Sequence, residues 1–183
     1  MNVFITGATG YIGFNVAMAY RRAGHAVWGL TRSAQKAQLL ARHEIRPVVG
    51  RMQETAGWAA AAKNCSVLIH AAVDYQADTF ALDLQTVEFL LSVARQGPQP
   101  KTLIYTSGVW VYGNTRGALV DETTPLNPPK LVARRPAADL ATQSDGDATT
   151  APGPGNLRQG AQEGRRQRIE PRGHPGIAAI GGE

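Results

Sequence analysis

The sequence predicts a doubly wound α/β fold, in which a parallel sheet carries helices on both faces. Short apolar runs alternate with longer segments whose apolar residues recur at helical spacing, a pattern typical of parallel strands that are buried on both faces. The first apolar run also leads directly into a glycine-spaced turn and a helix. Right-handed crossovers would place the strands in the order 3-2-1-4-5, with a ligand crevice beyond the carboxyl ends of strands one and four.

The first strand is expected at Val3 to Ile5, and the turn after it carries Gly7, Gly10 and Gly13. The first glycines permit a tight turn and a close approach of the backbone to a pyrophosphate, and the last lets the helix pack against the strand. The N-terminus of that helix directs free N–H groups at an anion. The alternative is an ordinary strand-to-helix turn, but the strand before the glycines and the helix after them favour a nucleotide site.

The other elements continue this alternation along the chain. The further expected strands are Val27 to Leu30, Pro47 to Val49, Val67 to His70 and Thr102 to Thr106. The expected helices are Ala34 to Arg42, Trp58 to Lys63 and Phe80 to Arg95. The strands are short and mainly apolar, whereas the helices carry their apolar residues on one face. In the longest helix these inward residues are Leu82, Val87, Leu90, Leu91 and Ala94.

Residues that could form a core become scarce after Pro136. Every Trp, Tyr and Phe lies at or before Tyr112, and the later sequence is rich in Gly, Pro, Arg, Gln and Ala. Such a segment cannot bury enough apolar surface to offset the entropy of ordering it. We therefore expect one domain over residues 1–136 and a disordered tail over residues 137–183.

The abruptness of this change suggests a hypothesis about the coding DNA. A shifted reading frame in GC-rich DNA would produce Arg-, Gly- and Pro-rich sequence of this kind, so we expect the genuine sequence to end near residue 137. Translation of the other two frames downstream of that point tests the hypothesis. If neither frame gives helix- and strand-patterned sequence, the hypothesis is wrong.

Composition limits the class of protein. The chain of 183 residues has a net charge of +5, but its basic residues are scattered among acidic ones, so we expect no nucleic-acid partner. A mildly basic surface favours phosphorylated ligands instead. No apolar run is long enough to span a membrane, so we expect a cytoplasmic protein without a membrane partner. The single Cys65 has no C-x-x-C partner and precedes an apolar strand, which predicts a core position and no metal site.

Three segments are similar to motifs of the extended short-chain dehydrogenase/reductase family, and most of all to its epimerase/dehydratase branch. They are TGATGYIG at 6–13, VLIHAA at 67–72 and LIYTSGVWVYG at 103–113, in the family's order and spacing. The resemblance implies an NAD(P)-binding Rossmann domain and hydride exchange at a nicotinamide. The implied substrate is a small molecule, either a sugar nucleotide or another carbonyl or hydroxyl compound.

The resemblance also implies the residues of the site. Those implied to contact the cofactor are Gly7, Thr9, Gly10, Tyr11, Ile12, Gly13, His70, Ala71 and Ala72. Ser107 matches the serine that hydrogen-bonds the reacting oxygen and orients a catalytic tyrosine, so it is the one catalytic residue implied. A polar cap at a strand end is the alternative for His70, and a structural Ser-Gly turn is the alternative for Ser107.

Cofactor choice depends on the end of the second strand. In dinucleotide-binding sheets an Asp or Glu there hydrogen-bonds the ribose 2′-hydroxyl of NAD, whereas this chain has Leu-Thr-Arg-Ser at 30–33. Without a carboxylate, the 2′-phosphate of NADP meets no repulsion, and Arg32 offers it a planar set of donors. NADP is therefore expected, with NAD as second choice. The alternative is that Arg32 is merely solvated, beside a helix that Ser33 caps.

The chain departs from the family at its catalytic tyrosine. No Tyr-x-x-x-Lys occurs in the sequence, although in the family the lysine and the cofactor tune that tyrosine for general acid/base work. Tyr112 lies in a Val-Tyr-Gly segment where the family's tyrosine is structural, so we do not transfer the role to it. Either the chain belongs to a branch that never used the tyrosine, or its second half is not native.

Two functions remain open. One is an incomplete NAD(P)-dependent oxidoreductase or epimerase/dehydratase of low activity, and the other is a non-catalytic NADP-binding regulatory or scaffold protein.

Strand five would lie at an unprotected sheet edge, beside an exposed face of the helix Phe80 to Arg95, which is a template for pairing with another chain. We therefore expect homo-oligomers.

Overall fold

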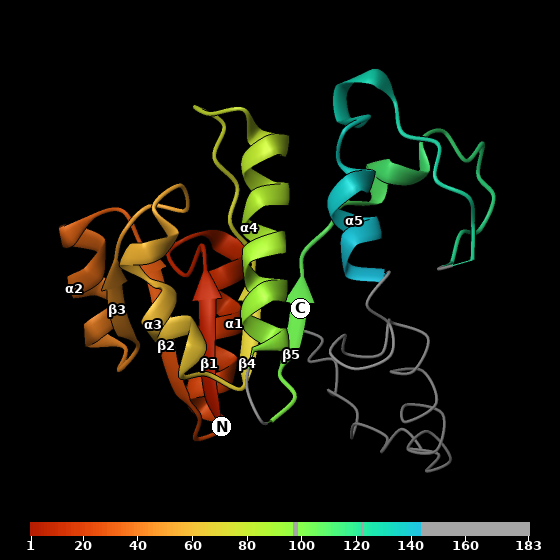
Figure 1. Ribbon diagram of the computed structural model, residues 1–183. Coiled ribbons are helices and arrows are strands. Elements are labelled where there is room, and N and C mark those ends of the chain that lie inside the picture. Colours follow the sequence, from red (N-terminus) through yellow and green to blue (C-terminus); the bar gives the residue numbers. More distant parts are fainter. Residues whose placement is uncertain (97–98, 122, 144–183) are drawn as a thin grey trace, which may run out of the picture. The chain divides into compact units, whose positions relative to one another are not determined.

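The computed structural model describes residues 1–96, 99–121 and 123–143, which lie in one compact unit. Its five strands form one parallel sheet in the order β3-β2-β1-β4-β5 (Figure 1), which confirms the predicted order. The strands are β1 (Asn2–Thr6), β2 (Ala26–Thr31), β3 (Arg46–Val49), β4 (Val67–His70) and β5 (Thr102–Tyr105). The chain runs outward from β1 to β3 and then returns past β1 to β4, so the switch point lies between β1 and β4.

Helices cover both faces of this sheet. They are α1 (Tyr11–Arg22), α2 (Ala34–Arg42), α3 (Ala59–Lys63), α4 (Thr79–Arg95) and α5 (Pro136–Gln143), with short 3₁₀ helices η1 (Thr55–Gly57), η2 (Val109–Tyr112) and η3 (Lys130–Val132). Helices α1 and α2 pack on one face, and α3, α4 and α5 pack on the other. The expected strands and helices all occur, with ends that differ by one residue at most.

Alternate residues of the inner strands β2, β1 and β4 supply the two cores. Val3 and Ile5 face α1 and α2, whereas Phe4 between them faces α3 and α4. Trp58 fills the second core, because its ring stacks on Phe4 at 5.5 Å and meets the ring of Phe89 edge-on at 4.8 Å. Burial on both faces explains why the strands read as continuous apolar runs. Cys65 is buried, and the inward residues expected on the longest helix are buried as well.

Two helices begin at side-chain caps that fix their start. The Ser33 hydroxyl accepts a hydrogen bond from the Lys36 N–H, so the cap that belonged to the alternative interpretation of Arg32 is present. The Asp78 carboxylate accepts one from the Ala81 N–H, so α4 starts at Thr79, one residue earlier than predicted. Both caps lie at the carboxyl edge of the sheet, where the candidate site is expected.

The chain after β5 forms loops and then helix α5. This helix begins at Pro136, where the sequence predicts the end of the domain, and its Ala138 and Ala141 pack against the core on the α4 side. Part of the α4 face that was expected to be exposed is therefore covered. The rest of the expected tail, residues 144–183, lies outside the described residues, so the domain boundary stays a prediction.

Candidate functional site

The glycine turn follows β1 and opens onto the N-terminus of α1. Gly7 has a φ of +70°, a left-handed conformation that favours glycine, and the Gly10 N–H donates to the Gly7 carbonyl at 2.9 Å. Gly10 is the N-cap of α1, and among the described residues this end of the helix has no side-chain cap. The N–H groups of the first turn therefore remain available to an anion.

The three glycines meet different surroundings. A Cβ atom at Gly7 would lie 2.6 Å from the Ala71 carbonyl oxygen, and one at Gly13 would lie 2.2 Å from the Gly7 carbonyl oxygen. At Gly10 a Cβ atom would lie 3.3 Å from the Gly7 carbonyl oxygen, a tight contact, and would meet no other atom of the described residues within 4 Å apart from its chain neighbours. Gly7 and Gly13 thus allow close backbone packing, whereas the backbone at Gly10 is exposed. An open backbone over a helix N-terminus fits the pyrophosphate of a dinucleotide.

The second motif lies directly against this turn. The Ala71 N–H donates to the Thr6 carbonyl at 3.3 Å, which continues the pairing of β4 with β1. Ala71 and Ala72 are half-buried, and Tyr11 at the start of α1 is exposed over 89% of its surface. The first two motifs therefore meet at the switch point between β1 and β4, as the fold predicts.

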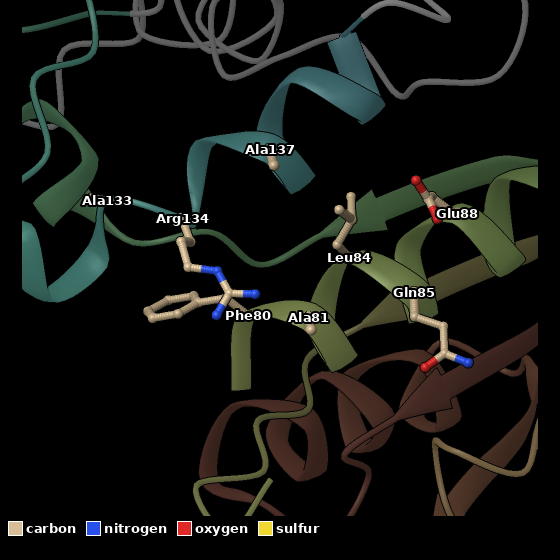
Figure 2. A pocket seen from close by; sticks show the side chains of 8 residues that line it. All are labelled: Phe80, Ala81, Leu84, Gln85, Glu88, Ala133, Arg134 and Ala137. Carbon is tan, nitrogen blue, oxygen red and sulfur yellow. The ribbon is translucent and has the colours of Figure 1, made fainter. Parts of the chain in front are cut away.

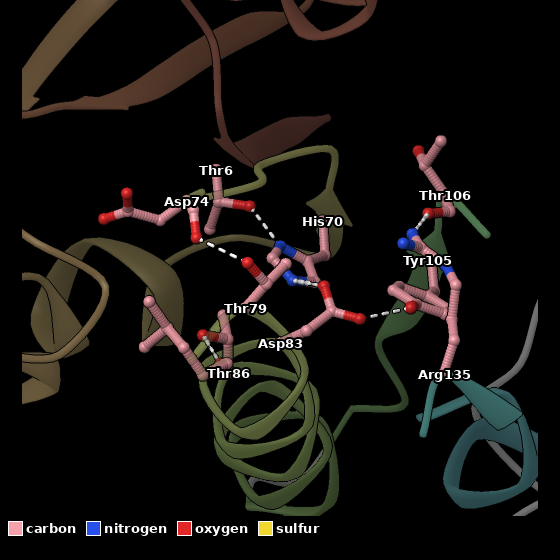
Figure 3. A network of polar contacts seen from close by, with 10 residues as sticks. Thr6, His70, Asp74, Thr79, Asp83, Thr86, Tyr105, Thr106 and Arg135 are labelled. Carbon is pink, nitrogen blue, oxygen red and sulfur yellow. Dashed lines mark hydrogen bonds and ion pairs between the residues drawn. The ribbon is translucent and has the colours of Figure 1, made fainter. Parts of the chain in front are cut away.

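His70 belongs to a buried polar network rather than to the surface (Figure 3). Its ring is 1% exposed, with Nδ1 at 2.6 Å from the Thr6 hydroxyl and Nε2 at 3.1 Å from a carboxylate oxygen of Asp83. The Tyr105 hydroxyl donates to the other oxygen of Asp83. These bonds tie the ends of β1, β4 and β5 to α4. A contact between the His70 ring and a cofactor would require an exchange of partners.

Asp83 holds its charge in this network despite its burial. Burial alone raises the pKa of the Asp83 carboxyl, but hydrogen bonds from His70 and Tyr105 outweigh that effect and leave the pKa below its usual range. Asp83 belongs to none of the motifs predicted from the sequence. The sequence still carries a signal for it, because Asp83 is an acidic residue among the apolar residues of the helix that are expected to face inward, such as Leu82 and Val87. A carboxylate in such a place needs a buried partner.

Arg32 directly follows β2, and its guanidinium forms an ion pair. Its Nη1 lies 2.8 Å from a carboxylate oxygen of Asp74, which follows β4. The other Asp74 oxygen accepts from the Gln76 N–H at 3.1 Å. This backbone hydrogen bond, together with the Arg32 charge, lowers the pKa of Asp74. Asp74 could not be predicted as a partner of Arg32, because only the folded sheet brings the ends of β2 and β4 together.

Ser107 lies just beyond β5 at the same edge of the sheet. The Thr106 N–H donates to the His70 carbonyl at 2.9 Å, so the β4–β5 pairing reaches the residue before Ser107. Ser107 is exposed, as are Val109 and Trp110 in the 3₁₀ helix that follows. The fold thus brings the glycine turn, the Ala71–Ala72 segment and Ser107 to one edge, with Arg32 at the β2 end of it.

A separate pocket of about 350 Å³ lies between α4 and the start of α5 (Figure 2). Its lining residues are Phe80, Ala81, Leu84, Gln85, Glu88, Ala133, Arg134 and Ala137. None of these belongs to the strand ends or to the glycine turn.

Within the described ranges, no cluster of His, Cys, Asp and Glu is suited to hold a metal ion. The helices of the same ranges are all too short or too polar to cross a membrane.

Comparisons with known proteins agree with this arrangement. The model of the NAD dependent epimerase/dehydratase family matches residues 3–134. An uncharacterised protein of Schizosaccharomyces pombe is 27% identical over 135 residues, which are 72% of this chain and 45% of that protein. A 4-hydroxy-2-methyl-3-oxo-4-farnesyl-3,4-dihydroquinoline-1-oxide ketoreductase of Stigmatella aurantiaca is 29% identical over 161 residues, which are 85% of this chain and 47% of that protein. The chain thus spans about half the length of these relatives.

Solved structures show the same fold. The dTDP-glucose 4,6-dehydratase of Bacillus anthracis, determined in complex with NAD, superposes with a TM-score of 0.67 at 19% identity. The superposition covers 79% of this chain and 50% of the dehydratase.

Proposed function

Since the chain belongs to the NAD-dependent epimerase/dehydratase family, we propose that it binds a nicotinamide dinucleotide at the glycine turn and serves an NAD(P)-dependent oxidoreductase or epimerase/dehydratase reaction. When bound, the nicotinamide supplies hydride exchange with the substrate. The observation that carries the proposal is the open backbone at Gly10, which lies over the uncapped N-terminus of α1. An enzyme of this kind would act in the cytoplasm.

Each part of the turn has a place in this proposal. The pyrophosphate lies over Gly10 and accepts hydrogen bonds from the first N–H groups of α1, while Thr9, Tyr11 and Ile12 flank it. Gly7 and Gly13 take part by letting the turn lie close to Ala71 and to the helix. The segment His70, Ala71, Ala72 contributes through its backbone, because the His70 ring already has partners inside the protein.

Arg32 is the residue that favours NADP over NAD. Residues 30–33 at the end of β2 include no Asp or Glu. The Arg32 side chain is exposed over 52% of its surface, so a 2′-phosphate can reach its guanidinium. NAD remains the second choice. Titration of the chain with NADPH and NADH tests this part, and equal affinity for the two cofactors would contradict it.

Ser107 is the proposed catalytic residue, because it is exposed just after β5, at the same edge of the sheet as the glycine turn. It would hydrogen-bond the reacting oxygen of the substrate. The exposed Val109 and Trp110 beside it offer an apolar surface for a small carbonyl or hydroxyl compound, with a sugar nucleotide as the other candidate. The domain proposed for this work is residues 1–136 together with the rest of α5, whose Ala138 and Ala141 pack against the core on the α4 side.

The second candidate function is an NADP-binding regulatory or scaffold protein without turnover. One observation favours it, namely the absence of a Tyr-x-x-x-Lys from the chain. Substrate-dependent loss of NADPH absorbance beyond one turnover per chain would establish an enzyme, and a Ser107→Ala variant should then lose that activity while it still binds NADPH. Cofactor binding without any turnover over a panel of ketones and sugar nucleotides would support the regulatory role.

A further inference from the structure

The ion pair between Arg32 and Asp74 joins two strand ends that are not neighbours. Strand β1 lies between β2 and β4, so the pair links the two ends that flank the start of the glycine turn. A dinucleotide that passes from β2 toward β5 must pass this pair. The contact therefore lies where the adenosine ribose of a bound cofactor would meet the protein.

Asp74 is the fixed member of the pair, and Arg32 is the movable one. Asp74 is 8% exposed and accepts a second hydrogen bond from the Gln76 N–H, and its carbonyl accepts one from the Thr79 hydroxyl at 2.9 Å (Figure 3). Arg32 is half exposed and reaches Asp74 through one nitrogen only, Nη1. The guanidinium can thus turn toward a ligand while the carboxylate stays in place.

We propose that Asp74 determines cofactor specificity by holding, from the loop after β4, a carboxylate against Arg32 that competes with the 2′-phosphate of NADP for the guanidinium. This inference rests on the proposed function, in which Arg32 faces the ribose of a nicotinamide cofactor. A 2′-phosphate must share Arg32 with the carboxylate or displace it, and a phosphate beside a carboxylate is repelled. The 2′-hydroxyl of NAD carries no charge and meets neither cost. Asp74 therefore weakens the preference for NADP that Arg32 alone would create.

The test compares variants by their affinity for NADPH and NADH, and by their affinity for the fragments 2′,5′-ADP and 5′-AMP, which differ by the same phosphate. Asp74→Asn keeps the size of the side chain and an oxygen for the Gln76 N–H. It should bind NADPH and 2′,5′-ADP on the order of tenfold more tightly, with NADH and 5′-AMP unchanged. Glu88→Gln is the matched control, because it removes one exposed carboxylate from α4, and it should leave all four affinities unchanged.

A double-mutant cycle with Arg32→Ala shows whether Asp74 changes NADPH affinity through Arg32. If Asp74 acts through Arg32, the gain from Asp74→Asn should shrink markedly when Arg32 is already alanine. Thermal unfolding of each variant confirms that it is folded. Unchanged or weaker NADPH binding by Asp74→Asn overturns the inference. The assignment of NADP survives that result as long as Arg32→Ala lowers the NADPH preference, and it fails by itself if Arg32→Ala has no effect on that preference.

Discussion

Removal of the Asp83 carboxylate should destabilise the fold more than any exposed charge on the same helix. Asp83→Ala leaves the Nε2 atom of His70 and the hydroxyl of Tyr105 without this acceptor. An unsatisfied buried donor costs about 1–3 kcal/mol, and His70 is fully buried, whereas Tyr105 is half-buried and can turn to water. The free energy of unfolding should therefore fall by about 2–4 kcal/mol.

Urea unfolding followed by tryptophan fluorescence measures this change, because Trp58 is stacked on Phe4 in the core that α4 covers. Glu88→Ala is the control on the exposed side of α4 and should change the free energy by about 0.5 kcal/mol or less. If Asp83→Ala costs no more than Glu88→Ala, the network does not hold the strand ends together, and this reasoning is refuted.

The same carboxylate gives the stability a defined pH dependence. The pKa of Asp83 in the folded chain lies below its ordinary value, so its contribution is fully present above the unfolded pKa of about 3.9. The contribution is lost as the pH falls through the folded pKa. Stability curves for wild type and Asp83→Asn should therefore approach each other in this acid range and stay apart near neutrality. Parallel curves down to low pH would contradict the stabilising hydrogen bonds assigned to the Asp83 carboxylate.

Three further predictions concern the cofactor, the core and association. Arg32→Asp should reverse the order of affinity so that NADH binds more tightly than NADPH, because a lost charge-assisted phosphate contact costs about 1.5–3 kcal/mol. Isothermal titration measures both affinities, and an unchanged order would contradict the role of Arg32. Trp58→Ala should lower the free energy of unfolding by about 3–5 kcal/mol, since Trp58 is fully buried. A loss below about 1 kcal/mol in a urea titration would show that the neighbouring side chains fill the space of the indole ring. The chain should form concentration-dependent oligomers in sedimentation experiments, because β5 is the edge strand of the sheet, whereas a single monomeric species at every concentration would remove the edge argument.

The sequence was sufficient for the sheet because its signal is local. A strand buried on both faces must be apolar throughout, and the five-stranded order then follows from crossover handedness. The packing role of Gly13 could likewise be assigned from its spacing, whereas the close approach of Gly7 to Ala71 depends on the pairing of β1 with β4. The end of the domain was less certain, because the packing of Ala138 against the core depends on the three-dimensional surface of α4 and not on hydrophobicity.

The site was predictable in position but not in its electrostatics. Ser107 and the glycine turn reach the same edge because each follows a parallel strand. Asp74 and Asp83 were missed, since their partners lie 42 and 13 residues away along the chain and meet them only through the sheet. For the same reason the sequence could describe Arg32 only by its immediate neighbours, as a cation without a carboxylate. In the folded chain a carboxylate lies 2.8 Å from it.

Cofactor binding at the glycine turn is the central claim, and a paired substitution tests it most directly. Gly10→Val places a branched side chain where the pyrophosphate must approach the backbone, whereas Gly57→Val adds the same atoms at a position where a Cβ meets nothing within 4 Å. NADPH fluorescence titration should show binding by wild type and by Gly57→Val, and no detectable binding by a Gly10→Val chain that melts like wild type. Equal NADPH affinity in all three folded chains, or no binding of either cofactor by the wild type, would contradict the account.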